Sequence, residues 1–464
     1  MARALHHFSR FACRLAPGAT DACGYIERGF SKVIRTILCA LVGWAAFAAH
    51  AHAADPFPRL GGIFISDPRN YEDASYQEAI SKLDLAIMSV YPGWEQEHGT
   101  TMEAVAKRIK TLNPDIRIFL YFIPESRKLP MNGGWADLGT KLDGQRWWGY
   151  QSGGSGTKVL SDFGNETYVV NLTNFAPADS SGKRSNQWIA QYAVDKLIAS
   201  TPSVDGLFTD NMFWKPRVNA DWNRDGQADS QDDTAVQKYY REGNRTYLNA
   251  LKALMPGKLQ IANIADWGKA ASTITEYDQL LPGGVMENVV GKSYSVESWA
   301  GWPALLNHYR KSMQALAPPK LGMFSQSGEP SDYQSMRYGL ATSLLDDAYY
   351  AFHDLDGFSG VPWFDEFDVS LGQATTAPPT AAWQNGVWRR DFEGGIALVN
   401  PKGNGAKEIT LEKDYRKISG NQDRAVNNGE TVRKVTLRDR DGIILLRMQR
   451  RPRAPSGVRI NPQG

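Results

Sequence analysis

Short apolar runs alternate with longer amphipathic stretches between residues 60 and 353. The amphipathic stretches repeat their apolar positions every three to four residues, which is typical of helices lying with one face on a core. The short runs are almost continuously apolar, as expected for parallel strands that are covered on both faces. The expected helices are 102–112, 186–199, 235–254, 302–315 and 333–345. The expected strands are 62–66, 83–91, 116–123, 204–211, 259–263, 284–288, 320–325 and 348–353.

Eight strands that alternate with helices predict an α/β protein, a (β/α)8 TIM barrel spanning residues 54–369. No Gly-rich dinucleotide fingerprint follows the first strand, which disfavours an open Rossmann sheet. Residues 127–184 break the alternation and are rich in Gly, Ser, Trp and Tyr, so we expect an insertion there at the C-terminal face of the barrel. Beyond a Thr/Pro linker at 370–380, short alternating runs predict a small antiparallel β-sandwich-like domain over 381–447.

The first 53 residues have the features of a signal peptide. A basic stretch precedes an apolar run of about 14 residues, and Ala51-His-Ala53 supplies a small-x-small cleavage pattern before Ala54. This predicts a periplasmic or secreted protein without stable membrane insertion after cleavage, and an uncleaved anchor is the alternative. At the other end, the Arg/Pro-rich tail 448–464 is expected to be disordered. All three cysteines precede residue 54, which excludes thiol catalysis and disulfides in the mature protein.

Charge and histidine content narrow the choice of partners and cofactors. After residue 53 the chain has 46 Lys and Arg against 48 Asp and Glu, so no basic footprint for nucleic acid is present. The three remaining histidines are His98, His308 and His353, and they do not have metal-ligand spacing. This disfavours a zinc or iron site, and with it the alternative of a metal-dependent polysaccharide deacetylase.

In a parallel barrel, the active site forms where the strands end, so acidic residues at these positions are the candidates for catalysis. Asp210 ends the fourth expected strand, and an ionised carboxylate there can stabilise or attack an oxocarbenium-like centre. Glu287 ends the sixth strand among apolar residues, which raise a carboxyl pKa and suit a general acid. Asp266, after the fifth strand, is the rival acid. The alternatives are a helix-capping Asp and a paired Glu. Spacing along the chain leaves retention versus inversion open.

Aromatic residues favour a carbohydrate polymer or oligosaccharide as the partner. Thirteen of the fourteen tryptophans follow residue 53, and many lie in expected loops. Sugar rings pack their C–H faces on flat aromatic rings while nearby polar groups bind the hydroxyls. Any single Trp is more often a core residue, yet several that follow strand ends together favour a sugar cleft. The residues expected to bind substrate are Trp94, Trp214, Trp267, Asp67, Asn211 and Asn263.

A twelve-residue acidic loop at 221–232 has the spacing of a calcium loop. Oxygen ligands occupy positions 1, 3, 5, 9 and 12, position 7 offers its carbonyl, and Gly226 is at position 6. The loop resembles a calcium loop of the dockerin type, and a solvated acidic turn is the alternative. It predicts a structural Ca²⁺ bound by Asp221, Asn223, Asp225, Gln227, Asp229 and Asp232.

Several short motifs resemble those of glycoside hydrolase-like family 15, a family of (β/α)8 barrel, glycosidase-like proteins. They are Gly-Leu-Phe-Thr-Asp-Asn at 206–211, Val-Met-Glu-Asn at 285–288, Trp-Phe-Asp-Glu-Phe-Asp at 363–368 and Trp-Arg-Arg-Asp-Phe-Glu at 388–393. By analogy with other barrel glycosidases, the resemblance implies a nucleophile at Asp210 and an acid/base at Glu287. The motif at 363–368 either reaches the pocket or links the barrel to the β domain, and its place beside the linker favours a link.

These patterns together predict an exported glycoside hydrolase that cleaves O-glycosidic bonds of a poly- or oligosaccharide with a pair of carboxylates. The alternative is a non-catalytic carbohydrate-binding barrel that takes part in exopolysaccharide assembly or export. Such a protein would keep the Trp-rich cleft but would lack a productive pair of carboxyl groups.

Overall fold

A computed structural model describes residues 56–448 except 67–69, 153–155, 271–273, 292–294 and 356. The expected signal peptide, the tail from residue 449 and the candidate Asp67 lie outside the described residues. Within the described part, no helix has the length and apolar character needed to cross a bilayer.

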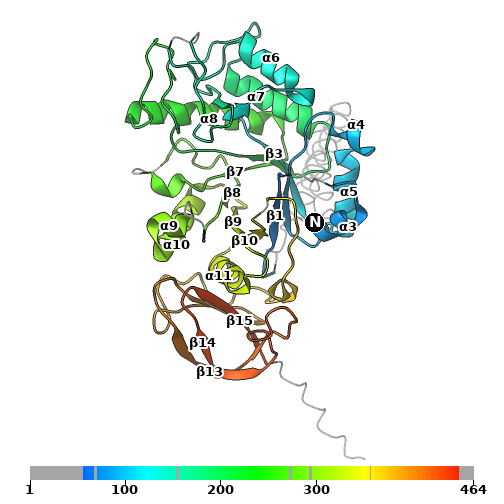
Figure 1. The fold of residues 1–464 in the computed structure, drawn as a ribbon, viewed down its shortest axis with the longest axis vertical. Coiled ribbons are helices and arrows are strands. Elements are labelled where there is room, and N and C mark those ends of the chain that lie inside the picture. Colours follow the sequence, from blue (N-terminus) through cyan, green and yellow to red (C-terminus); the bar gives the residue numbers. More distant parts are fainter. Residues whose placement is uncertain are drawn as a thin grey trace, which may run out of the picture. The chain divides into compact units, whose positions relative to one another are not determined.

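Eight parallel strands form one sheet in the order β1-β2-β3-β6-β7-β8-β9-β10. A parallel bridge between Leu60 and Tyr350 joins the two ends of this order, so the sheet closes into a barrel (Figure 1). The predicted (β/α)8 fold is therefore confirmed, and each expected strand overlaps an observed one. The strands are β1 (Gly61–Phe64), β2 (Leu85–Met88), β3 (Arg117–Phe122), β6 (Gly206–Thr209), β7 (Leu259–Asn263), β8 (Gly283–Met286), β9 (Leu321–Ser327) and β10 (Tyr349–His353).

Helices cover the outside of the barrel. In α5 (Met102–Leu112), Met102, Val105 and Ile109 form the buried stripe, and Thr101 caps the helix by accepting from Ala104 N at 3.1 Å. The longest of the described helices, α8 (Thr234–Leu254), follows the candidate calcium loop and is capped by Asp233. The other helices outside the inserted segment are α3 (Ala74–Ser81), α4 (Trp94–His98), α7 (Ser185–Ala193) with a π-helical turn (Val194–Ile198), α9 (Val296–Ala300), α10 (Trp302–Ala315) and α11 (Tyr333–Leu344).

The inside of the barrel is filled by side chains from alternate positions of the strands. Phe119, Phe208, Ile261 and Val285 belong to this inner cluster, and each is almost completely buried. The side chains of a strand alternate between its two faces, so the residue two positions further along each strand also faces inward. This alternation places the candidate site at the C-terminal rim.

The segment inserted after β3 has its own secondary structure. A two-stranded antiparallel sheet pairs β4 (Ser126–Lys128) with β5 (Thr167–Val169). A 3₁₀ turn (Gly133–Trp135) leads directly into α6 (Ala136–Gly144). The insertion therefore adds ordered elements beside the rim and is not an open loop.

The C-terminal part is a five-stranded antiparallel sheet in the order β11-β12-β15-β13-β14. Its strands are β11 (Trp388–Asp391), β12 (Gly395–Asn400), β13 (Lys407–Lys417), β14 (Thr431–Leu437) and β15 (Asp441–Arg447). Gly442 of β15 lies against α11, where a Cβ atom would stand 2.5 Å from the Arg337 carbonyl oxygen. Asp365 accepts from Gln422 N at 2.9 Å, and Glu366 accepts from Asn427 Nδ2 at 2.9 Å. The motif at 363–368 thus binds the β domain.

Candidate active site

Three polar side chains occupy the inward row at the ends of adjacent strands. β6, β7 and β8 are neighbours in the sheet, and Thr209 pairs with Ala262 while Asn263 pairs with Val285. Asp210, Asn263 and Glu287 each come two residues after an inward-facing apolar residue, namely Phe208, Ile261 and Val285. All three line one small cavity. Strand register and the two-residue period are therefore sufficient to bring these candidates together.

Asn263 joins the two candidate carboxylates. Its Nδ2 atom donates to Asp210 Oδ1 at 3.1 Å and to Glu287 Oε2 at 2.9 Å. Its Oδ1 atom accepts from Ala265 N at 3.1 Å, which is consistent with this orientation of the amide. The two carboxylate oxygens cannot lie farther apart than the sum of the two Nδ2 distances, so the pair is close.

Asp210 accepts hydrogen bonds at both of its carboxylate oxygens. Besides Asn263, the Asn211 backbone N–H donates to Oδ1 at 2.8 Å, and the Tyr121 hydroxyl donates to Oδ2 at 2.6 Å. Burial raises the pKa of Asp210, and these hydrogen bonds oppose the rise because they stabilise the ionised form. The Tyr121 pKa is held well above its usual value by burial and by the adjacent Asp210 charge, so Tyr121 stays a donor.

The residue after each carboxylate has a left-handed backbone. Asn211 has φ 56° and Asn288 has φ 47°, a region that Asn tolerates better than most other residues. Asn288 N donates to Ser325 Oγ at 3.1 Å, and Ser327 Oγ donates to Asn288 Oδ1 at 2.9 Å. The chain thus turns sharply behind each carboxylate, which is a common arrangement at functional sites.

Glu125 is a buried carboxyl group at the rim that the sequence analysis missed. It is 4% exposed and accepts from Asn211 Nδ2 at 3.3 Å. Glu125 therefore contacts the side chain of the residue that directly follows Asp210. Burial raises the pKa of Glu125 to about 7. The signal was available, because Glu125 follows the third expected strand with only Pro124 between them.

Asp266 lies apart from the close pair. It precedes the 3₁₀ turn Trp267–Lys269 and is absent from the residues that line the cavity of Asp210 and Glu287. Burial raises the pKa of Asp266 to about 7, and the nearby charges of Arg217 and Lys269 oppose this rise.

The tryptophans expected in the pocket are mainly packed against other residues. Trp94 is 1% exposed and stacks on His98 with ring centroids 4.4 Å apart. Trp267 stacks on Tyr277 and donates its Nε1 hydrogen to the Met212 carbonyl oxygen at 2.7 Å. Trp214 is partly buried against the core. None of the three lines the cavities described here.

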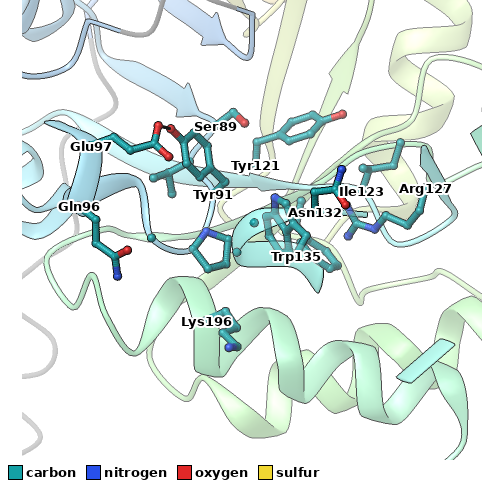
Figure 2. A pocket seen from close by; sticks show the side chains of 16 residues that line it. Ser89, Tyr91, Gln96, Glu97, Tyr121, Ile123, Arg127, Asn132, Trp135 and Lys196 are labelled. Atoms are coloured by element: carbon teal, nitrogen blue, oxygen red, sulfur yellow. Dashed lines mark hydrogen bonds between the residues drawn. The ribbon is translucent and has the colours of Figure 1, made fainter. Parts of the chain in front are cut away.

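A much larger cleft adjoins the carboxylate pair. The cavity around the pair is only about 30 Å³, whereas the neighbouring cleft is about 870 Å³ and is lined mainly by residues that follow β2, by residues of β3 and by the insertion. Tyr121 lines both, and its hydroxyl contacts Asp210. Figure 2 shows Tyr121 among the cleft residues, together with Tyr91 and Trp135. Tyr121 is therefore the side chain shared by the cleft and the carboxylate cavity.

The calcium-like loop has part of the expected geometry. Asp221 is buried and its Oδ2 accepts from Gly226 N at 3.0 Å, while Gly226 has φ 99°. Asn223 and Asp225 form Asx turns, in which each side-chain oxygen accepts from the backbone N–H two residues later. Asp232 instead contacts Lys215 Nζ at 2.5 Å. In the described part of the chain, no three His, Cys, Asp or Glu side chains converge to hold a metal ion.

A profile of the hypothetical glycosyl hydrolase family 15 matches residues 110–396, more than half of the chain. The protein belongs to this family. The part that matches runs from α5 to β12, so this member of hypothetical glycosyl hydrolase family 15 has Asp210, Asn263 and Glu287 within the matched region. A comparison with curated proteins found no match.

Solved structures with a similar fold are distant in sequence. The glycoside hydrolase domain of PelA from Pseudomonas aeruginosa is 12% identical with a TM-score of 0.40, and the match covers 66% of this family member and 99% of that domain. The α-amylase from Geobacillus thermoleovorans, solved with acarbose, is 11% identical with a TM-score of 0.43, covering 84% and 99%. The α-galactosidase AgaA from Geobacillus stearothermophilus is 10% identical with a TM-score of 0.43, covering 85% and 56%.

Proposed function

We propose that the protein is a retaining glycoside hydrolase that cleaves O-glycosidic bonds of a poly- or oligosaccharide. Family membership supports the reaction class, and the contact of one Asn263 nitrogen with both Asp210 and Glu287 carries the mechanism. Retaining enzymes hold their two carboxyl groups roughly 5–5.5 Å apart, whereas inverting enzymes need roughly 6.5–9.5 Å to admit a water molecule. Because one donor contacts both groups, the two contacting oxygens lie no farther apart than the sum of the two hydrogen-bond distances, which supports the shorter separation.

In this mechanism Asp210 is the nucleophile and Glu287 the acid/base. Glu287 donates its proton to the glycosidic oxygen while Asp210 attacks the anomeric carbon, so the bond to the leaving group breaks and a glycosyl ester forms. Glu287 then takes a proton from water, and the water oxygen displaces Asp210. The hydrogen bonds from Tyr121, Asn263 and the Asn211 backbone favour the ionised Asp210 that this role requires.

The first experiment is a screen of the purified protein against bacterial and plant polysaccharides with analysis of the products. The initial product anomer, followed by NMR, should have the configuration of the substrate. Hydrolysis with inversion would exclude Asp210 as a nucleophile, and sugar binding without hydrolysis of any substrate would instead favour the non-catalytic binding barrel. For the variants Asp210→Asn and Glu287→Gln, Glu329→Gln is a matched control, because this exposed carboxylate also follows a barrel strand.

We also propose that the loop 221–232 binds a structural Ca²⁺. The hydrogen bonds of Asp221, Asn223 and Asp225 fold the first half of the loop as an EF-hand-type site requires. Binding requires Asp232 to exchange Lys215 for the metal ion. Calorimetric titration of chelator-treated protein with Ca²⁺ tests this proposal, and the absence of binding heat together with an unchanged melting temperature would refute it.

Export through the N-terminal segment is the last part of the proposal. The basic stretch, the apolar run and the Ala51-His-Ala53 pattern support cleavage before Ala54. Mass analysis of the protein recovered from the periplasm or the medium should give a chain that begins at Ala54. Recovery of the full precursor from membranes would support an uncleaved anchor instead.

A further inference from the structure

The large cleft next to Asp210 contains one cation whose charge is not compensated. Arg127 of β4 lines this cleft, and in the described part of the chain it forms no ion pair and its Nη2 atom is buried without a hydrogen-bond partner. Burial lowers the pKa of Arg127 to about 10, so the guanidinium remains charged at neutral pH. The Arg127 side chain is half-buried, and a buried guanidinium nitrogen without an acceptor is costly, so a ligand that supplies an acceptor is favoured here.

The other charged groups of the cleft already have partners. Lys196 Nζ forms an ion pair with Asp137 at 2.8 Å, and Glu97 accepts from the Tyr91 hydroxyl at 2.6 Å. In Figure 2, Glu97 and Arg127 lie at opposite ends of the set of labelled cleft side chains. An anion that enters beside Arg127 therefore meets one free positive charge.

Aromatic rings surround the guanidinium. Its central carbon lies 4.4 Å from the centre of the Phe122 ring and 5.3 Å from that of Trp135. Figure 2 shows the Arg127 guanidinium directed toward Trp135. An aromatic face beside a cation suits a sugar ring that carries a negatively charged substituent, because the ring packs on the aromatic face while the cation binds the substituent.

We propose that this cleft is a subsite for an anionic sugar, with the Arg127 guanidinium binding the carboxylate of a hexuronate residue. The planar fork of an arginine matches the two oxygens of a carboxylate better than it matches neutral hydroxyls. Tyr121 separates the subsite from Asp210, so the uronate occupies a position next to the bond that is cleaved. This inference rests on the proposed hydrolase function and specifies its substrate class.

Binding to the full mature protein tests the inference independently of hydrolysis. Oligosaccharides of galacturonate, mannuronate and glucuronate are titrated into the Asp210→Asn variant, each beside its carboxyl-reduced, neutral counterpart. At least one uronate should bind roughly ten- to hundred-fold tighter than its reduced form, because a charge-assisted hydrogen bond is lost on reduction. The preference should fall as NaCl is added. If no uronate in the set binds tighter than its reduced form, the subsite proposal is wrong.

Substitution of Arg127 tests whether this residue causes the preference for uronates over their reduced forms. Arg127→Gln should abolish most of the uronate preference while leaving binding of the reduced sugars, and Arg127→Lys should restore part of it. Lys128→Gln is the matched control because Lys128 is the exposed next residue of the same strand. Melting temperatures verify that each variant is folded. A uronate preference that survives in folded Arg127→Gln would overturn the role of Arg127, and tighter binding of sulfated than of uronate sugars would overturn the carboxylate assignment.

The outcomes also separate this inference from the hydrolase proposal. Hydrolysis of uronate-containing substrates with the same kcat/KM in wild type and folded Arg127→Gln would leave the hydrolase standing and remove the uronate subsite. Loss of uronate binding in Arg127→Gln, in a protein that hydrolyses nothing, would leave the subsite standing and remove the hydrolase.

Discussion

The Tyr121 hydroxyl donates to Asp210 Oδ2 at 2.6 Å, and the same tyrosine lines the large cleft. Tyr121→Phe removes this donor without changing the ring, so the pKa of Asp210 should rise further above its usual value. Because hydrolysis needs ionised Asp210, the acidic limb of the pH–rate profile should move to higher pH. The rate constant kcat should fall roughly ten- to hundred-fold, as expected for a hydrogen bond to a charged group. An unchanged pH profile would show that Tyr121 does not act on Asp210.

The two carboxylates should respond differently to substitution. Glu287→Gln should reduce kcat roughly 10²–10⁴-fold for natural substrates, with a smaller loss for substrates whose leaving group needs no proton. Asp210→Asn should be impaired for both classes, because both require the nucleophile. Azide should rescue Glu287→Gln by replacing the water that Glu287 activates. Equal losses for both substrate classes in Glu287→Gln would contradict the acid/base role.

Glu125 should make the stability of the protein depend on pH. Its pKa in the folded protein is about 7, above the ordinary value of 4.5, so the folded state binds a proton more tightly than the unfolded state. The stabilisation from this proton is complete below pH 4.5 and is lost as the pH rises to 7. Glu125→Gln should therefore be more stable than wild type at pH 8, by about 2–4 kcal/mol, and nearly equal at pH 4.5.

Urea denaturation of wild type and Glu125→Gln at the two pH values measures this difference. The exposed Glu78→Gln serves as the control and should show no comparable change. A difference between wild type and Glu125→Gln that is the same at both pH values would contradict the raised pKa.

Calcium should stabilise the folded protein if the loop 221–232 binds it. At a free concentration 100 times the dissociation constant, a single site adds about 2.7 kcal/mol to the free energy of unfolding. Trp222 is 1% exposed within the loop, so its fluorescence offers a second readout. Asp221→Asn should lose both responses, whereas Asp195→Asn, an exposed residue of the π-helical turn, should keep them.

Arg337 should be essential for the junction between the barrel and the β domain. It is 4% exposed and contacts Asp423 at 2.8 Å and Glu366 and Asp441 at 3.9 Å each. Arg337→Met leaves these carboxylates without their cation, which should cost about 3–5 kcal/mol of unfolding free energy. Denaturation curves measure the loss, and the exposed Arg424→Met is the control. A loss of unfolding free energy below about 1 kcal/mol would show that the Arg337 ion pairs contribute no more than exposed surface ion pairs do.

The barrel could be predicted because its strands are continuously apolar and its helices are amphipathic. The same regularity led to Asp210 and Glu287, since the C-terminal ends of parallel strands meet at one rim. The bridging contact of Asn263 could not be predicted, because it depends on the orientation of its side-chain amide, which the strand order does not determine. Glu125 also follows a strand closely, but its burial and its contact with Asn211 depend on tertiary packing that the local sequence pattern does not show. Apolar and aromatic patterns also do not distinguish a Trp of the core, such as Trp94, from one that lines a cleft.

Arg127 comes from β4 of the inserted segment, whereas Asp210 and Glu287 come from the strands of the barrel. The group proposed to select the substrate and the groups proposed to react with it therefore belong to separate structural units. Related proteins could exchange the insertion and acquire a new sugar preference without altering the strand ends. Grafting a different segment between β3 and α7 is accordingly a direct route to redirecting this barrel toward another polysaccharide.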